Sequence, residues 1–251
     1  MRFAGRVAVV TGAGGAIGGA IAERLASEGA SMALTDLDAD ALRTRADQLQ
    51  PRLSSDAVLV AGDLSDTETA ASLAAACRNR FGGIDVLVNN AGGGIIRPTL
   101  EHTEETLQAT LARNLWTALR TTFAVLPVMR DAGYGRIVFV GADSVRNGLD
   151  RHAVYNAAKG GVHAFARGLA RECAREGITV NTVAPCATAT PGLEAILEQD
   201  PAAGEAFLRV IPMGRPAALA EVASAVAYLA SEEASFITGQ VLGVNGGSTM
   251  N

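Results

Sequence analysis

Tyr155 and Lys159 lie four residues apart, so in a helix their side chains share one face. Apolar residues follow at helical spacing, among them Val162 and Leu169, and favour a helix here. A phenol has an ordinary pKa of about 10 and is a poor base at neutral pH, whereas a neighbouring ammonium group favours the phenolate and lowers that pKa. A tyrosine of this kind can exchange a proton with an alcohol or a carbonyl oxygen. The same spacing also occurs where a tyrosine simply packs and a lysine is solvated, so the other elements must decide.

A glycine-rich turn follows the first apolar run of the chain. Residues 7–10 read Val-Ala-Val-Val, which is typical of a strand buried on both faces of a parallel sheet. Residues 12–18 are rich in glycine, and a helical pattern continues through Ile21 and Leu25. Such a turn lets the backbone approach a pyrophosphate, while the helix N-terminus supplies amide groups and a partial positive charge. The segment therefore predicts a dinucleotide-binding turn.

Asp36 comes directly after the second predicted strand, residues 31–35, about 20 residues beyond the turn. A carboxylate at that place can accept hydrogen bonds from a ribose diol and would repel a 2′-phosphate. No arginine or lysine lies in the glycine-rich turn to offset that repulsion, so the sequence favours NAD(H) over NADP(H). The alternative is that Asp36 caps the next helix, since Asp38 and Asp40 are close by and a helix follows.

Strands and helices alternate along the whole chain. Further strands are expected at residues 57–60, 84–88, 136–140, 178–183 and 241–244, and helices at about 66–81, 103–130 and 153–176. Pro127 is expected to kink the second of these helices. The pattern predicts an α/β fold: one Rossmann-type domain over residues 1–251, with a doubly wound, seven-stranded parallel sheet and helices on both faces. Residues 187 to about 213 break the rhythm just after a strand, which predicts helical excursions that form a substrate lid.

Composition and charge exclude several classes of protein. The net charge is −5 and there is no basic cluster, so a nucleic acid is not an expected partner. The three cysteines, Cys77, Cys173 and Cys186, form neither a disulfide framework nor a metal-binding spacing, which predicts a cytoplasmic protein without a metal. No stretch approaches the roughly 20 uninterrupted apolar residues of a membrane span.

Taken in order, these stretches resemble the short-chain dehydrogenase/reductase family over nearly the whole chain. The resemblance rests on residues 11–18, Asp63, residues 89–92 (Asn-Asn-Ala-Gly), Asn114, Tyr155 with Lys159, and residues 181–185. It implies a homotetramer or dimer that moves a hydride between nicotinamide and a carbon of a small-molecule substrate. It also implies that Tyr155 is the acid/base, that Lys159 holds the ribose and lowers the tyrosine pKa, and that Asn114 anchors a water linking the lysine to solvent.

The residues expected to bind NAD come from the strand ends and the turns that follow them. They are Gly12, Gly14, Gly15, Ala16, Ile17, Gly18, Asp36, Leu37, Asp63, Leu64, Asn90, Ala91, Gly92, Tyr155, Lys159, Pro185, Thr188 and Thr190.

Three positions depart from the family pattern. Ala16 and Cys186 stand where glycines are usual; we expect the methyl group of Ala16 to be tolerated, and Cys186 to be a small packed residue or a weak contact to nicotinamide. Ala142 stands 13 positions before Tyr155, where the family usually has the serine that polarises the substrate carbonyl. Ser144 is a candidate replacement if the loop bends back, and is otherwise a turn residue. One such donor is worth about a hundred- to a thousandfold in rate.

The sequence thus predicts an NAD-dependent oxidoreductase that acts on a secondary alcohol or ketone, with Tyr155, Lys159, Asn114 and Ser144 as its catalytic residues. Two other functions stay open. An NADPH-dependent 3-oxoacyl reductase is opposed mainly by Asp36, and a non-catalytic dinucleotide-binding sensor is favoured only by the missing serine.

Stretches near Tyr155 and near the C-terminus are similar to those of 2-hydroxycyclohexanecarboxyl-CoA dehydrogenases and 3-oxoacyl reductases within the family. This similarity implies an alicyclic or acyl-thioester β-hydroxy substrate, which the apolar residues 93–96 and Leu149 would suit. Arg97, Arg146 and Arg151 are candidates to meet a carboxylate or a CoA phosphate, and are otherwise solvated surface residues.

Overall fold

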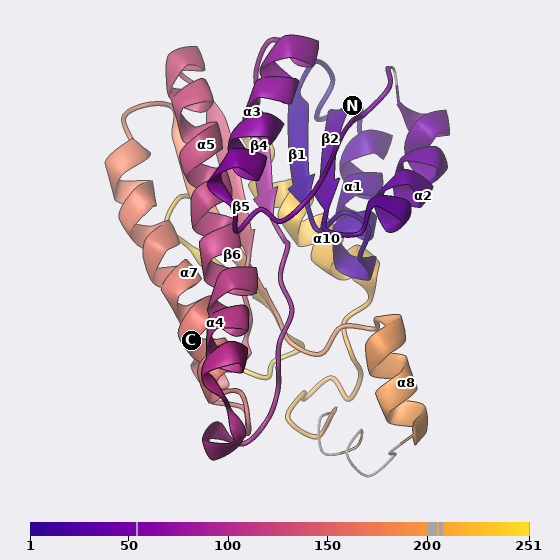
Figure 1. Ribbon diagram of the computed structural model, residues 1–251, viewed down its shortest axis with the longest axis vertical. Helices are drawn as coiled ribbons and strands as arrows, with labels where there is room; N and C mark the ends of the chain where they lie inside the picture. The colour runs from indigo at the N-terminus through magenta and orange to yellow at the C-terminus, as the bar shows by residue number, and fades with distance from the viewer. Residues whose placement is uncertain (54, 200–204, 206–207, 251) are drawn as a thin grey trace.

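The computed structural model describes residues 1–53, 55–199, 205 and 208–250. Its strands form one seven-stranded parallel sheet in the order β3-β2-β1-β4-β5-β6-β7 (Figure 1). They are β1 (Val7–Thr11), β2 (Ser31–Asp36), β3 (Val58–Ala61), β4 (Val86–Asn89), β5 (Gly135–Val140), β6 (Ile178–Pro185) and β7 (Val241–Val244). The strand order reverses between β1 and β4, so the predicted doubly wound fold is confirmed.

Helices cover both faces of the sheet (Figure 1). Helices α1 (Ala16–Ser27), α2 (Ala39–Leu49) and α10 (Leu219–Leu229) pack on one face, and α3 (Thr67–Phe81), α5 (Thr117–Ala132) and α7 (Ala153–Cys173) on the other. Each face has its own buried apolar cluster, as expected for strands that are apolar on both sides.

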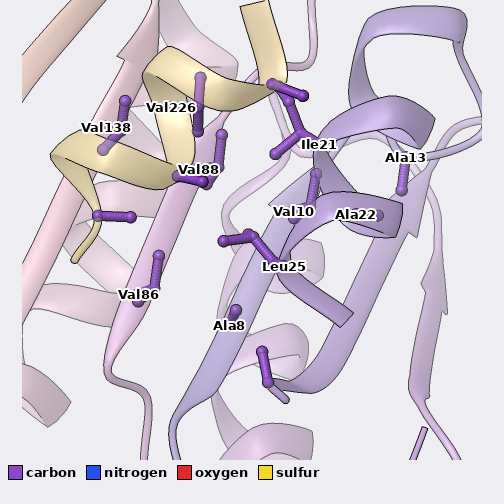
Figure 2. Packing of buried hydrophobic residues seen from close by; sticks show 14 of the residues in the cluster. Ala8, Val10, Ala13, Ile21, Ala22, Leu25, Val86, Val88, Val138 and Val226 are labelled. Carbon is purple, nitrogen blue, oxygen red and sulfur yellow. The ribbon is translucent and has the colours of Figure 1, made fainter. Parts of the chain in front are cut away.

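The first of these clusters positions the glycine-rich turn. Figure 2 shows Ile21 and Leu25 of α1 and Val226 of α10 beside Val10 of β1 and Val88 of β4. All five side chains are fully buried. Their packing holds the N-terminus of α1 just beyond the carboxyl end of β1, where a parallel α/β sheet binds its ligands.

The long helix expected over residues 103–130 is not a regular α-helix. Helix α4 (Glu104–Leu111) passes into a π-helical turn (Ala112–Trp116) before α5 begins. The predicted helix is thus interrupted at residues 112–116, and Pro127 lies inside α5 without ending it; a kink at Pro127 stays a prediction. The π-helical turn contains Asn114, and such turns are frequent at functional sites.

The predicted lid contains one described helix, α8 (Pro191–Gln199). It lies beyond the carboxyl ends of the strands, apart from both helical layers (Figure 1). Residues 200–204 and 206–207 of the predicted lid lie outside the described residues, and its role stays a prediction. Before α8, Thr188 forms a parallel bridge with Ala217, which leads into α10. Within the described ranges, no helix is long and apolar enough to cross a membrane.

We expect Leu25→Ala to lower the free energy of unfolding by about 2–5 kcal/mol, because it leaves a cavity between α1 and the sheet. Leu100→Ala removes the same atoms from a side chain that is 99% exposed and should change stability by less than about 0.5 kcal/mol. Urea unfolding of both variants measures the difference. Equal effects would contradict the assignment of Leu25 to the core that holds α1.

Candidate active site

The carboxyl ends of the central strands open into one cavity of about 1340 Å³. Pockets for drug-sized ligands are usually about 300–1,000 Å³, so this cavity has room for a larger ligand together with a substrate. Every residue that the sequence predicted to bind the cofactor, from Gly12 to Thr190, lines it. Of the four predicted catalytic residues, Tyr155, Lys159 and Ser144 line the cavity, and Asn114 lies behind its wall.

The glycine-rich turn gives the cavity an anion-binding end. Gly12 has a φ of +65°, which a residue with a side chain rarely adopts, and a Cβ on Gly18 would lie 2.0 Å from the Gly12 carbonyl oxygen. Gly15 is the N-cap of α1; no side chain caps this helix, and its first turn contains no acidic residue. The amide groups at the start of α1 therefore have no side-chain cap, which fits a bound pyrophosphate. Ala16 begins α1 and lines the cavity, and tolerance of its methyl group by the pyrophosphate stays a prediction.

Asp36 lies on the cavity wall with its carboxylate held in place. Oδ2 accepts a hydrogen bond from the Gly14 amide at 2.9 Å, and Oδ1 accepts one from the Asp38 amide at 3.1 Å. The side chain that caps α2 is Asp38, which accepts from the amides of Asp40 and Ala41. Asp36 is thus not the helix cap, and its carboxylate is oriented next to the glycine-rich turn as a ribose site requires.

Tyr155 and Lys159 lie on α7 at the opposite end of the cavity. Lys159 Nζ donates to the carbonyl oxygen of Val140 at 2.8 Å and is 6.0 Å from the centroid of the Tyr155 ring. Burial raises the pKa of Tyr155 to about 12 and lowers the pKa of Lys159 to about 8. The expected lowering of the tyrosine pKa by the ammonium is therefore outweighed by the burial of both groups. Lys159 is also the only lysine in the chain.

Asn114 supports the loop after β4 from behind. Its Nδ2 donates to the carbonyl oxygens of Gly93 and Thr110, each at 2.9 Å, and its Oδ1 accepts from the Gly93 amide at 3.2 Å. A Cβ on Gly92 would lie 2.7 Å from Asn114 Oδ1, so the loop passes directly over this side chain. The same loop is tied to β1, because Asn90 Nδ2 donates to the carbonyl oxygen of Thr11 at 2.9 Å. These contacts position the loop between the two ends of the cavity.

The segment after β5 places Ala142 and Ser144 on the cavity wall. Short helix α6 (Ser144–Asn147) begins directly after Asp143, so the loop does turn at the place the sequence required. The Ser144 hydroxyl donates to Asn156 Oδ1 at 2.6 Å, so its proton is already committed to the protein. Ser144 is therefore well placed to accept a hydrogen bond from a ligand, whereas donating one would require the Asn156 bond to break.

Asp143, between these two residues, is fully buried and points away from a ligand. Its carboxyl oxygens accept hydrogen bonds from Asn245 at 2.8 Å, Thr249 at 3.0 Å and Asn147 at 3.3 Å. The segment after β5 is therefore fastened to the C-terminal segment, and Ser248 of that segment also lines the cavity.

The sequence predicted an apolar wall at the substrate end and left a ligand-binding role open for three arginines. Gly93, Gly94, Ile96 and Leu149 line the cavity as expected for an apolar substrate wall. The three candidate arginines lie outside the cavity lining: Arg97 donates to the Glu101 carbonyl, Arg146 to the Val241 carbonyl, and Arg151 pairs with Asp150. These contacts favour the alternative that the sequence also gave, in which the three arginines are solvated or structural residues.

Sequence reasoning missed several residues of the cavity wall. Arg113, Asn147, His152 and Ser248 all line it. His152 precedes Tyr155 by three residues, a helical spacing that could have indicated it, and the two rings meet edge to face with centroids 6.0 Å apart. Ser248 offers no such signal, because only the tertiary fold brings it to the segment after β5.

Cys186 also lines the cavity, and burial raises the pKa of its thiol to about 11. The group is thus a neutral thiol at physiological pH, as expected of a small packed residue. Across the described positions, no cluster of His, Cys, Asp and Glu is arranged to hold a metal ion.

We expect Lys159→Met to change the pH dependence of stability. Burial lowers the pKa of Lys159 from 10.5 to about 8, so between these values the unfolded chain binds a proton that the folded chain has lost. In this window the free energy of unfolding of the wild-type protein should rise with pH relative to that of the variant, by roughly 1 kcal/mol per pH unit at most. Urea unfolding below and within the window measures the change.

The single lysine provides a direct check of the same pKa. In protein labelled at the lysine side chain, one NMR resonance should titrate near pH 8, whereas a solvated lysine titrates near about 10.4. An ordinary lysine pKa together with parallel stability curves would show that Lys159 is solvated.

The sequence matches a family model over nearly its whole length. The model, described as enoyl-(acyl carrier protein) reductase, matches residues 12–249. The 2,3-dihydroxy-2,3-dihydro-p-cumate dehydrogenase of Pseudomonas putida is 53% identical over 246 residues, which cover 98% of this chain and 95% of the relative. The 3-oxoacyl-(acyl-carrier-protein) reductase of Escherichia coli (strain K12) is 38% identical over 250 residues, with both chains covered completely.

Solved structures of oxidoreductases are similar to the structure as a whole. The crystal structure of levodione reductase has a TM-score of 0.92 and 32% sequence identity, and covers 98% of each chain. The crystal structure of an NAD+-bound xylitol dehydrogenase has a TM-score of 0.93 and 30% identity, and covers 98% of this chain and 100% of the other. The similarity therefore includes every strand that contributes to the cavity.

Proposed function

The chain belongs to the short-chain dehydrogenase/reductase family of oxidoreductases acting on CH–OH groups, and we propose that it uses NAD to oxidise a secondary alcohol carried on a ring. One observation carries this proposal: a single cavity has the oriented Asp36 carboxylate at one end and the Tyr155–Lys159 pair at the other. A function as a non-catalytic dinucleotide sensor is set aside, because the relatives that match this chain over its full length are named as dehydrogenases and reductases.

Tyr155 is proposed to take the proton of the substrate hydroxyl. NAD, when bound, supplies the acceptor for the hydride of the carbinol carbon. Lys159 is proposed to hold the nicotinamide ribose and to add positive charge near the phenol, which favours the phenolate against the burial that raises its pKa. Asn114 is proposed to hold the loop after β4 in place and to anchor a water behind Lys159. Ser144 is proposed to contact the substrate, where its oxygen can accept a hydrogen bond.

The preference for NAD follows from charge at the ribose end. The Asp36 carboxylate is fixed by two backbone amides and lines the cavity, so a 2′-phosphate would approach a negative group. Gly14 and the other residues of the turn offer no positive side chain. This arrangement opposes an NADPH-dependent 3-oxoacyl reductase, although that activity is named for a relative that is 38% identical.

A ring alcohol is the substrate class that the cavity and the relatives favour together. The relative that is 53% identical is named for a ring dihydrodiol, and the part of the wall formed by Gly93, Gly94, Ile96 and Leu149 is apolar. Oxidation of such a diol gives a hydroxyketone that can tautomerise to an aromatic catechol, so the proposed direction is oxidation. Arg97, Arg146 and Arg151, the three arginines considered for a CoA phosphate, lie outside the cavity lining.

A homotetramer or a dimer in the cytoplasm is proposed for the assembled protein. Trp116, at the end of the π-helical turn, and Phe123 of α5 are exposed, and Phe123 stacks on Phe165 of α7. Exposed aromatic side chains grouped in this way are typical of a protein–protein contact. The three cysteines are free, as expected in a reducing compartment.

Tyr155→Phe should lower kcat by at least about a hundredfold and leave the Kd for NADH within about threefold, because it removes only the proton-transferring hydroxyl. Steady-state oxidation of a ring diol and NADH fluorescence titration measure the two effects. Tyr228→Phe removes a hydroxyl from a half-exposed tyrosine on α10 and should change neither. Unchanged turnover in Tyr155→Phe would rule out the proposed acid/base.

Asp36→Asn should raise kcat/KM for NADP relative to NAD by about ten- to a hundredfold. Asparagine keeps an oxygen that can accept the Gly14 amide, while the charge that repels a 2′-phosphate is lost. Asp40→Asn removes a charge from a neighbouring exposed aspartate outside the cavity lining and should leave the ratio unchanged. The same ratio in both variants would place the ribose elsewhere.

A further inference from the structure

The cavity wall after β5 has its backbone donors turned into the protein. The amide of Gly141 donates to the Val183 carbonyl at 2.7 Å, and the amide of Asp143 donates to the Pro185 carbonyl at 2.9 Å. Between them, the amide of Ala142 donates to Nε2 of His163 at 3.3 Å. Three successive amides are thus committed to neighbours and do not point at a ligand.

The imidazole ring of His163 accepts this hydrogen bond from the Ala142 amide. Burial lowers the pKa of His163 to about 4, so the imidazole is neutral and its Nε2 can accept the Ala142 amide. The contact is close on the other side as well, because a Cβ on Gly141 would lie 2.1 Å from Nε2. The backbone at residues 141–143 is therefore held in this orientation.

Ser144, Asn147 and His152, side chains of the same wall, also donate hydrogen bonds to groups of the protein. Ser144 donates its hydroxyl proton to Asn156 Oδ1 at 2.6 Å. Asn147 directs Nδ2 at Asp143 Oδ2 and at Ser248 Oγ, at 3.3 Å and 2.9 Å. His152 Nδ1 lies 2.6 Å from the Asp150 carbonyl oxygen, which can only accept, so Nδ1 carries a proton and donates it to this carbonyl.

Ala142 lines this wall with a methyl group. When an alcohol is oxidised, negative charge develops on its oxygen as Tyr155 takes the proton, and a second hydrogen-bond donor at that oxygen lowers the barrier. Among the described groups of the segment after β5, the committed contacts leave no protein hydroxyl or amide directed at that position.

We propose that the substrate supplies the missing donor: a second hydroxyl, cis and adjacent on the ring, donates to the oxygen that Tyr155 deprotonates. This inference rests on the proposed function, since it requires a ring alcohol as substrate. Cis hydroxyls on neighbouring ring carbons lie within hydrogen-bonding distance of one another. A vicinal diol thus restores the interaction that a serine at position 142 would make, and the site selects diols over simple alcohols by chemistry as well as by fit.

The step balances without a further reactant. The carbinol C–H bond breaks, and NAD, when bound, would accept its electron pair as hydride. The O–H bond breaks, the proton passes to the Tyr155 phenolate, and the C=O bond forms. The neighbouring hydroxyl keeps its own proton, which is hydrogen-bonded to the developing carbonyl oxygen throughout.

Three saturated substrates test the proposal without the driving force of aromatisation. They are cis-1,2-cyclohexanediol, its monomethyl ether cis-2-methoxycyclohexanol, which keeps the second oxygen but lacks its proton, and cyclohexanol. For the wild-type protein we expect kcat/KM to be about a hundredfold or more higher for the diol than for either other compound. Ala142→Ser should raise kcat/KM for the ether and for cyclohexanol by at least about tenfold and leave the diol within about threefold.

Ala187→Ser is the matched control, because it adds the same hydroxyl elsewhere on the cavity wall, after β6. Its diol-to-ether ratio should equal that of the wild-type protein. Circular dichroism and NADH titration establish that both variants fold and bind the dinucleotide.

Each outcome bears on the proposal. Selective rescue of the two simple alcohols by Ala142→Ser supports it. Equal wild-type turnover of all three compounds overturns it without a variant, and so does a diol preference that Ala142→Ser leaves unchanged or that Ala187→Ser abolishes equally well. Absence of turnover for all three compounds in every protein overturns the proposed function itself, which separates the two failures.

Discussion

The hydrogen bonds between Thr11 and Asn90 join the two halves of the site. Asn90 Nδ2 donates to the Thr11 carbonyl, while the Thr11 hydroxyl oxygen accepts from the amides of Asn90 and Ala91 at 2.9 Å and 2.8 Å. They link β1 to β4 at the point where the strand order reverses and the helices leave in opposite directions. On one side, Asn90 also donates to the carbonyl oxygen of Gly12 in the glycine-rich turn. On the other side, the loop that follows Asn90 is held at Gly93 by Asn114. A displacement of this junction would therefore move the glycine-rich turn away from Tyr155 and Lys159.

Burial controls the chemistry of the Tyr155–Lys159 pair in both directions. Removal from water disfavours the phenolate and the ammonium alike, so the two pKa values move toward neutral forms of both side chains. If Tyr155 acts as the proposed base, its phenolate must be stabilised by what occupies the cavity. A positively charged, oxidised nicotinamide ring would supply such stabilisation, so the proposed chemistry would depend on the bound dinucleotide.

The fold was predictable because its signals are local. Short apolar runs placed all seven strands within about two residues, and helical spacing placed Tyr155 beside Lys159. Whether Asp36 caps the next helix could not be decided from the sequence, and the structure excludes it, because the observed cap is Asp38.

What escaped prediction depends on contacts between distant residues. The π-helical turn around Asn114 has no periodic signature, and Arg97, Arg146 and Arg151 could not be placed without knowing which way their loops turn. Ser144 was expected to approach the cavity if the loop bent back; the loop does so, yet the proton of that serine is taken by Asn156, a partner that the sequence does not indicate.

Lys159 is 5% exposed, and every other cationic side chain of the protein except histidine is an arginine. Lysine-directed reagents therefore find no lysine side chain on the surface, and any lysine that they modify is the one inside the site. The rate at which a small acylating reagent labels this residue reports how accessible the cavity is, and slowing of that rate by added dinucleotide would report occupancy of the cavity. The protein thus carries its own reporter group, with no engineered probe required.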